Sequence, residues 1–290
     1  MQLTRIGSNI APFTGNKKNR MNNTAKKSGN NALMGWFSGG AIVFALLVGV
    51  LIYNYVMGNA SNFENNDIVK GHPKNILGII HRGGFIVPLL IAVNVTVLLV
   101  VIERFITLMA ASGKGNAASF IRRIREMLSN NRIDEAIAAC DQQKGSLASV
   151  VRGGLTRYKV VTKDGKLSTD EKKAAIEKEL EEATGLELPM LSRNLVIIST
   201  CASIGTLIGL IGTVFGMIRA FAALANTGAP DTAALATGIS EALVNTAFGI
   251  IASTLAIIFY NYFTNRIDSM TYSMDEAGYS IVSEFQANHA

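Results

Sequence analysis

One acidic side chain lies in a long apolar run of this sequence: Glu241, within residues 238–263. A charged carboxylate at the centre of a membrane helix costs about 2.5–3.5 kcal/mol on insertion scales, and such acids commonly belong to proton relays. Thr237 and Asn245 stand four residues before and after Glu241, so the three share one helical face. Thr246 lies about 140° round the helix and faces a neighbouring groove. We expect Glu241 to face a protein interior, either protonated or only transiently charged.

The preceding apolar run, residues 195–221, carries small and hydroxyl side chains in regular columns. Its glycines recur at steps of four, three and four, a face on which two membrane helices approach closely: Gly205, Gly209, Gly212 and Gly216. Beside it, hydroxyls recur at steps of seven: Ser199, Thr206 and Thr213. Thr213 and Glu241 are equally far along the chain from residue 227 in the intervening turn, which predicts equal depth in the membrane.

An alternative places Glu241 at the rim of the membrane, with its side chain extending to the outer surface. We expect the buried arrangement instead, because Thr213 lies at the same depth and polar neighbours surround the carboxyl. We also expect no basic partner at this depth. Arg219, about six residues nearer the outside than Thr213, is interpreted as an anchor at the membrane interface.

The elements that must position these residues are membrane helices. The chain is 49% hydrophobic and only 17% charged, whereas soluble domains carry nearer 25% charged residues. A spanning helix needs about 20 mostly apolar residues. Four runs qualify: 36–57, 85–108, 195–221 and 238–263. The sequence therefore predicts an all-α polytopic membrane protein, with four transmembrane helices and a helical cytoplasmic domain.

Basic residues orient these spans, since cytoplasmic loops carry an excess of Lys and Arg. Residues 1–35 hold six basic residues and no acid, and residues 103–194 hold sixteen, whereas residues 222–237 hold none. This predicts a basic cytoplasmic leader at 1–35, periplasmic segments at 58–84 and 222–237, a cytoplasmic domain at 109–194 and a cytoplasmic tail at 264–290. The net charge of +6 is thus a topology signal, and we expect no nucleic-acid partner.

The first span, residues 36–57, could in principle be a cleaved signal peptide. Its basic leader and its apolar core are both longer than the usual signal pattern, although small residues follow it in NYVMGNAS. We expect a retained anchor that packs on the outside of an oligomer.

The predicted cytoplasmic domain contains clear helix signals and no catalytic motif. An apolar face is formed by Phe120, Ile121, Ile124 and Leu128. Ser168 and Glu171 have the spacing of a capping box at the start of a Lys/Glu-rich helix. No nucleophile, phosphate loop or metal cluster stands out, so we expect no enzyme and no cofactor. We expect Cys140 and Cys201 to be unpaired thiols.

In three motifs the chain closely resembles the MotA/TolQ/ExbB proton channel family, most nearly an ExbB-type or TolQ-type subunit. These are the Gly-Thr-Val-x-Gly-Met run in GLIGTVFGMIRAF, the Glu-Ala-Leu-x-x-Thr run in ISEALVNTAFG, and the IERF end of an earlier span. The resemblance covers about residues 80–270. The chain departs from the family at Thr206, where members often have proline, and in its additional first span.

The resemblance implies a homo-oligomer, commonly a pentamer, in the bacterial inner membrane, with both termini cytoplasmic. Its pore would be lined by Thr213, Glu241 and Thr246, and would hold an ExbD- or TolR-like single-span subunit carrying a membrane aspartate. Protons would be the translocated ion, and their passage would drive a TonB- or TolA-like transducer. A lone carboxyl among hydroxyls favours protons over sodium.

Two other functions stay open at this point. The chain could be a non-conducting membrane scaffold, in which Glu241 only specifies helix assembly, or a stator of a related motility or envelope-division motor. A small-solute transporter is disfavoured, because the sequence has neither inverted repeats nor paired broken helices.

Overall fold

The computed structural model describes residues 39–68, 71–225 and 231–289. The chain divides into two compact units, residues 1–44 and 45–290. In the first unit, the described residues 39–44 are helical. The predicted basic leader, residues 1–35, lies outside the described residues.

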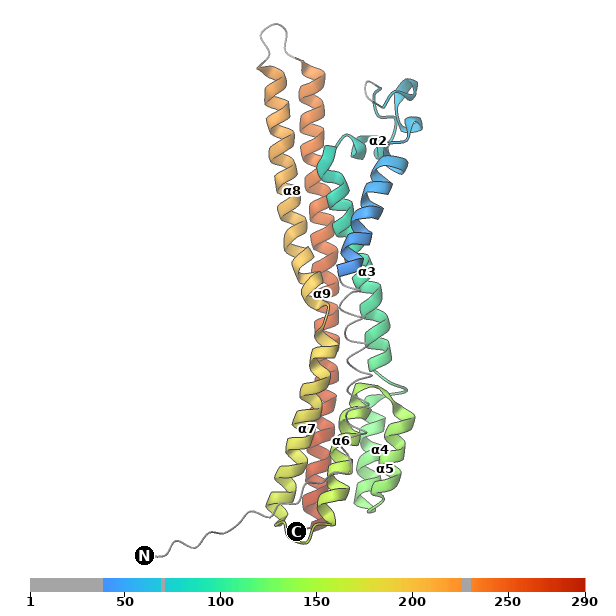
Figure 1. The fold of residues 1–290 in the computed structure, drawn as a ribbon, viewed down its shortest axis with the longest axis vertical. Helices are drawn as coiled ribbons and strands as arrows, with labels where there is room; N and C mark the ends of the chain where they lie inside the picture. The colour runs from blue at the N-terminus through green and yellow to red at the C-terminus, as the bar shows by residue number, and fades with distance from the viewer. Residues whose placement is uncertain (1–38, 69–70, 226–230, 290) are drawn as a thin grey trace, which may run out of the picture. The chain divides into compact units, whose positions relative to one another are not determined.

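The second unit consists of helices, and its described residues form no strand beyond one isolated bridge, between Phe63 and Pro73. It begins with helical residues 45–51 and the π-helix η1 (Ile52–Met57). The remaining helices are, in order, the short η2 (Ala60–Asn62), η3 (Glu64–Asn66), α2 (Ile76–His81) and η4 (Gly84–Ile86), then α3 (Val87–Ala111), α4 (Ala117–Ser129), α5 (Ile133–Gln143), α6 (Gly145–Thr162), α7 (Thr169–Ser192), α8 (Leu195–Leu224) and α9 (Thr232–His289) (Figure 1).

Among the described residues, four helical segments are long and apolar enough to cross a membrane. They are Gly39–Met57, Gly84–Ala111, the apolar part of Thr169–Leu224 and the apolar part of Thr232–His289. The prediction of an all-α polytopic membrane protein with four spans is therefore confirmed.

Helices α8 and α9 pack closely along the glycine face of α8. A Cβ atom added at Gly216 would lie 2.7 Å from the Gly238 carbonyl oxygen, and one added at Gly205 would lie 2.9 Å from Ser253 Oγ. Gly209 and Gly249 likewise face each other, with 3.2 Å between the Gly249 Cα and a Cβ added at Gly209. Because any side chain there would push the helices apart, the glycines fix the spacing and the register of the hairpin.

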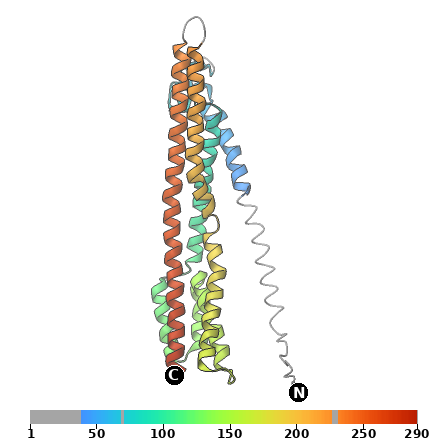
Figure 2. The same cartoon turned by 90° about the vertical axis from the view of Figure 1, so that its left-hand side faces the viewer.

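Helix α9 is one continuous helix of 58 residues, longer than the predicted span at both ends. It starts at Thr232, within the segment predicted as a turn, and continues to His289. Residues 264–290 were predicted as a tail, yet Ile267, Met274 and Phe285 on this part of α9 are buried in the main hydrophobic core. Figures 1 and 2 both show α8 beside the first half of α9 and α7 beside the second half.

Helices α4, α6 and α7 pack around this second half of α9, and α5 packs against α4 and α6. Residues of α3 and of the start of α8 complete that core. The predicted apolar face of α4 is buried: Phe120, Ile121, Ile124 and Leu128. Ser168 and Glu171 form the predicted capping box at the start of α7, with both reciprocal hydrogen bonds present. The two thiols are unpaired, as predicted, and burial raises the pKa of the Cys140 thiol to about 12.

The described residues between the first two spans, 58–68 and 71–84, include Ile80, which packs against Val87 and Ile91 at the start of α3. Asn62 is buried and donates to the Val56 and Met57 carbonyls at 2.8 and 3.0 Å, while Asn75 donates to Asn62 Oδ1 at 2.9 Å. Tyr53 of the π-helix stacks on His81, with 4.4 Å between ring centroids, and donates to the His81 carbonyl oxygen. This folded segment ends in the Gly83–Gly84 turn, which reaches α9.

Candidate functional site

Glu241 is buried inside the helical hairpin and forms an ion pair with Arg219 of α8. The glutamate side chain is only 3% exposed, and both of its oxygens accept from Arg219 Nη1, at 2.7 and 2.8 Å. The side chain therefore does not extend to the surface of the chain. The expectation of no basic partner was wrong, because Arg219, interpreted as an interface anchor, pairs with this carboxylate. The two residues meet because the hairpin sets them on facing turns.

The turn before α3 closes over this pair from the other side. Gly84 has a φ of +77°, a conformation that favours glycine, and a Cβ atom there would lie 2.1 Å from Glu241 Oε1. The next residue, Phe85, presents its ring to the Arg219 guanidinium, 5.8 Å from the ring centroid, and packs edge-to-face on Phe215. The carboxylate is thus enclosed by α8, α9 and this turn.

Asn245 lies one helical turn along α9 from Glu241 and is fully buried. Its Nδ2 donates to the Gly83 carbonyl oxygen at 3.0 Å, whereas its Oδ1 has no hydrogen-bond partner in the described protein. Gly212 accommodates it, since a Cβ atom on that glycine would lie 2.4 Å from the Asn245 Cβ. The buried oxygen is an acceptor for a water molecule or another donor.

The hairpin register places Thr213 away from Glu241. Gly216 faces Gly238 and Ala242, so Glu241 is level with Gly216 rather than with Thr213. The expectation of equal depth was therefore wrong by about three residues, or roughly 4.5 Å of helix. Thr213 donates to the Leu210 carbonyl oxygen at 2.6 Å and lines a shallow apolar hollow on the outer face of α8, with Val214, Met217, Ile218 and Phe221.

The other two threonines also lie apart from the ion pair. Thr246 donates to the Ala242 carbonyl oxygen at 3.2 Å, within its own helix. Thr206 donates across the hairpin to Ser253 Oγ at 2.7 Å. Within one chain, the structure thus brings Glu241 together with Asn245, and separates both from the three threonine hydroxyls.

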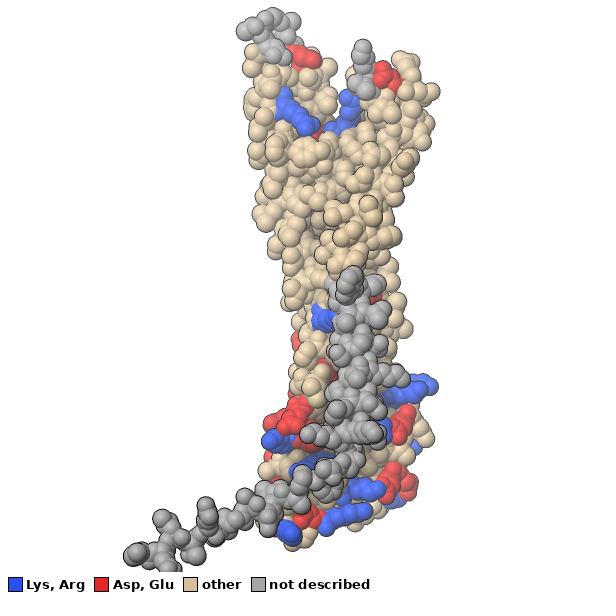
Figure 3. Space-filling model, viewed as in Figure 1, with Lys and Arg blue, Asp and Glu red and all other residues tan. Residues whose placement is uncertain are grey.

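A cavity of about 1040 Å³ opens beside the ion pair, at the end of the unit that holds the α8–α9 turn. Its walls come from Ile68, from residues 72–82, from Arg219 and from the first turns of α9. Its charged and titratable lining residues are His72, His81, Arg82, Arg219, Asp231 and Glu241. Figure 3 shows this end of the molecule hollowed, with basic side chains on both walls. Burial lowers the pKa of His81 below its ordinary value. The cavity gives solvent a route to Arg219 and Glu241.

A second ion pair, at the far end of α3, was not predicted from the sequence. Arg104 is fully buried and donates from Nε and Nη2 to the two oxygens of Glu103, at 2.7 and 2.5 Å. Its Nη1 donates to the Leu191 carbonyl oxygen at 3.1 Å. Thr107 and Asn194 also donate to Glu103, at 2.9 and 3.0 Å. The adjacent acidic and basic residues in IERF were the signal, but we took them only as the end of a span.

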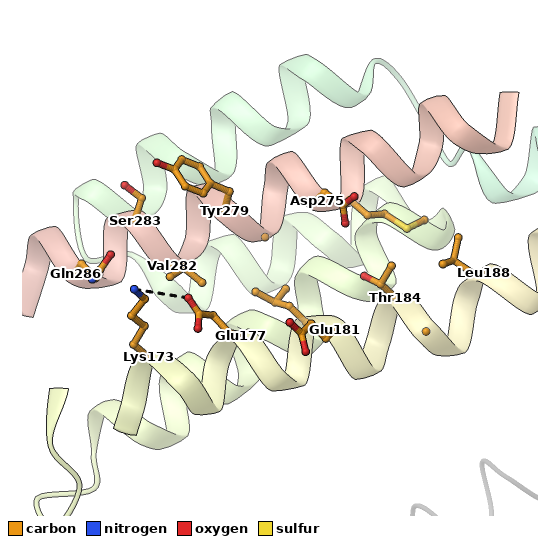
Figure 4. A pocket seen from close by; sticks show the side chains of 14 residues that line it. Lys173, Glu177, Glu181, Thr184, Leu188, Asp275, Tyr279, Val282, Ser283 and Gln286 are labelled. Atoms are coloured by element: carbon orange, nitrogen blue, oxygen red, sulfur yellow. Dashed lines mark ion pairs between the residues drawn. The ribbon is translucent and has the colours of Figure 1, made fainter. Parts of the chain in front are cut away.

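The structure offers no other site with obvious chemistry. The described residues contain no group of three or more His, Cys, Asp or Glu side chains that could hold a metal ion. A groove between α7 and α9 has an apolar floor that includes Leu180 and Met274, and its rim carries Glu177, Glu181 and Asp275 (Figure 4). None of these acidic side chains is buried, and Lys173 pairs with Glu177 at 3.8 Å. We therefore take the ion pair beside the cavity as the candidate functional site.

The part of the chain that contains Arg219 and Glu241 is also the part that is similar to known proteins. Residues 142–276 match the MotA/TolQ/ExbB proton channel family. The chain is 25% identical over 198 residues to the Tol-Pal system protein TolQ of Pseudomonas aeruginosa, covering 68% of this chain and 83% of that protein. It is 34% identical over 98 residues to the biopolymer transport protein ExbB of Salmonella typhimurium, covering 31% of this chain but only 40% of that protein.

A third relative is covered more fully. The chain is 31% identical over 114 residues to the biopolymer transport protein ExbB of Aquifex aeolicus. The aligned region covers 39% of this chain and 69% of that protein. The family match includes α8 and the part of α9 that carries Glu241 and Asn245. With four membrane-spanning helices and these relatives, the chain belongs to the MotA/TolQ/ExbB proton channel family.

Proposed function

We propose that this chain is the channel subunit of a complex in the bacterial inner membrane that uses the proton-motive force to drive a TonB- or TolA-like transducer. One observation carries the proposal. Glu241 is 3% exposed, enclosed by three elements of the chain, yet it lines a cavity that solvent reaches. A carboxyl in this position is sheltered from lipid and remains able to exchange a proton.

The proton would enter from the cavity, bind Glu241 and leave toward the other side of the membrane. The buried Asn245 Oδ1, one turn farther along α9, offers an acceptor for a water molecule on this route. Thr213, Thr246 and Thr206 would line the continuing path, where copies of the chain meet around a single-span ExbD- or TolR-like subunit with a membrane aspartate. A homo-oligomer, commonly a pentamer in this family, would supply that lumen.

The free energy released by one proton crossing the membrane is large enough to change a few contacts at Glu241. One proton crossing 100 mV releases about 2.3 kcal/mol, comparable to the strength of one or two protein hydrogen bonds to a charged group. Each proton could therefore rearrange a few contacts at Glu241 and no more. The work delivered to the transducer would come from many such steps.

A second candidate function is a non-conducting membrane scaffold. The Arg219–Glu241 pair favours it, because a carboxylate paired with an arginine is also what a purely structural contact would show. In that case Glu241 would specify how α8 and α9 assemble, and no proton would move through it.

Glu241→Gln separates the two functions. Glutamine keeps the volume of glutamate and one of the two oxygens that accept from Arg219, but it cannot carry a proton. In cells depleted of the native protein, the channel function predicts an assembled complex with no gradient-driven activity, measured as nutrient uptake for a TonB-like role and as envelope integrity during division for a TolA-like role. Glu177→Gln, on the outer surface of α7, is the matched control. Full activity in an assembled Glu241→Gln complex would support the scaffold.

A further inference from the structure

The Arg219–Glu241 pair is held by one nitrogen only. Nη1 makes both bonds to the carboxylate, and Nε and Nη2 have no hydrogen-bond partner among the described residues of the chain. The Arg219 side chain is 50% exposed and lines the cavity, whereas Glu241 is 3% exposed. The guanidinium therefore extends from the buried carboxylate to the wall of the cavity.

No other face of the carboxylate is open. On the side toward α3, the Gly84 backbone approaches so closely that even a methyl group would overlap Glu241 Oε1. On the side toward α8, Gly216 packs against Gly238 and Ala242, the neighbours of Glu241 on α9. A proton arriving from the cavity meets two oxygens that already accept from Nη1.

We propose that Arg219 is the gate of this site, a charged side chain that competes with the incoming proton for the same two oxygens of Glu241. The proposal rests on the proposed channel function and adds a residue that controls it. When a proton from the cavity binds an oxygen of Glu241, a neutral carboxylic acid forms and the attraction to Arg219 is lost. The guanidinium keeps its charge and turns into the cavity, and it returns when Glu241 releases the proton inward.

The surroundings of Arg219 suit a side chain with two positions. The Phe85 ring faces the guanidinium, and a cation over an aromatic face is stabilised without a fixed hydrogen-bond partner. Asp231 lines the same cavity and supplies a carboxylate on its wall, although this side chain also accepts from the Ala234 amide at the start of α9. Arginine remains charged throughout, so the gate needs no proton of its own.

The test measures proton entry into whole cells that express the full chain with its native complex. A pH-sensitive fluorescent protein in the cytoplasm reports acidification after an acid pulse outside. We expect Arg219→Gln to acidify the cytoplasm several-fold faster than wild type, because the site stays open. In cells that express the double variant, Arg219→Gln with Glu241→Gln, we expect the cytoplasm to acidify no faster than in cells that do not express the chain. Arg219→Lys, which keeps a charge beside Glu241, should restore a low rate.

A matched control removes an arginine from another pair: Arg125→Gln, whose Nε donates to Glu284 at 2.9 Å between α4 and α9. It should acidify at the wild-type rate, and all variants should assemble to the wild-type size on native gels. If assembled Arg219→Gln is as slow as Glu241→Gln while wild type still drives the transducer, the gate is overturned and the channel function stands. If Glu241→Gln also leaves transducer activity intact, the channel function itself fails, and the gate with it.

Discussion

Two arginine–carboxylate pairs lie at opposite ends of the membrane-spanning region, and they differ in how fully they are satisfied. Glu103 accepts from Arg104, Thr107 and Asn194, and Arg104 also donates to the Leu191 carbonyl oxygen. Glu241 accepts from a single nitrogen of Arg219, which is half exposed to a cavity. The first pair joins α3 to the α7–α8 junction, whereas the second leaves most of its arginine uncommitted.

The difference shows how a membrane protein can use the same two residue types for opposite purposes. A buried charge is tolerated where every polar atom has a partner, and such a network holds helices in one arrangement. A buried carboxylate with one removable partner keeps a second state within reach. Burial alone therefore does not distinguish the two acids, whereas the number of their hydrogen-bond partners does.

The largest effect is expected from breaking the satisfied pair. Arg104→Met leaves the Glu103 carboxylate without its counterion, and removing one member of a buried pair costs about 3–5 kcal/mol. We expect a large fall in the apparent melting temperature of the purified protein and poor accumulation in membranes. Arg219→Met should cost much less, because water from the cavity replaces the guanidinium. Thermal unfolding in lipid nanodiscs measures both.

The double variant Glu103→Leu with Arg104→Met serves as the control for that experiment. Replacing both members of a buried pair by apolar residues is often neutral or stabilising, so it should recover much of the lost stability. Equal losses in Arg104→Met and Arg219→Met would contradict the distinction between the two pairs.

A smaller effect on stability, but a complete one on activity, is expected from Gly84→Ala. The new methyl group would meet Glu241 Oε1 and displace the carboxylate from Arg219. The positive φ adds a strain of about 1–3 kcal/mol. We expect loss of gradient-driven activity in an assembled complex, measured as for Glu241→Gln. Gly115→Ala is the matched control. Gly115 also has a positive φ, +86°, but a Cβ atom added there would lie 3.8 Å from the nearest heavy atom, Gln143 Oε1.

Retained activity in Gly84→Ala would show that the turn before α3 does not position the carboxylate. Lost activity in Gly115→Ala would instead show that backbone strain alone disables the protein.

The smallest effect on stability is expected from low pH, acting on His81 at the wall of the cavity. Burial lowers the pKa of His81 below 6.5, so the unfolded chain binds this proton more readily than the folded chain does. The stability that neutral His81 contributes is therefore fully present above pH 6.5 and is lost as the pH falls through its folded value. We expect the apparent melting temperature to drop between pH 7.5 and pH 5, and to drop less in His81→Gln. The same change of melting temperature with pH in both proteins would show that His81 does not contribute to this pH dependence.

The spans and the packing face could be predicted from the sequence, because apolar length and glycine spacing are local properties. The run predicted as 195–221 corresponds to α8, which also begins at Leu195. The end of α9 could not be placed in this way. Its polar second half looks like a tail along the chain, and only the fold shows that Phe285 and Met274 are buried against α4–α7.

The candidate site could be predicted only in part. Glu241 stood out because a charge in an apolar run is rare, but its partner could not be identified. Arg219 lies 22 residues away along the chain, and a register error of about three residues moved it out of reach. Gly84 was missed for a different reason, since its positive φ and its contact with Glu241 arise only when α3, α8 and α9 pack together.

The continuity of α9 has a mechanical consequence. A helix of 58 residues without a break is a stiff rod of about 87 Å, at 1.5 Å per residue. Glu241 lies near one end of this rod, and Phe285, fully buried among α4–α7, lies near the other. A small tilt or twist imposed at the acid would therefore reach a tightly packed domain far from it with no break in the helix between them.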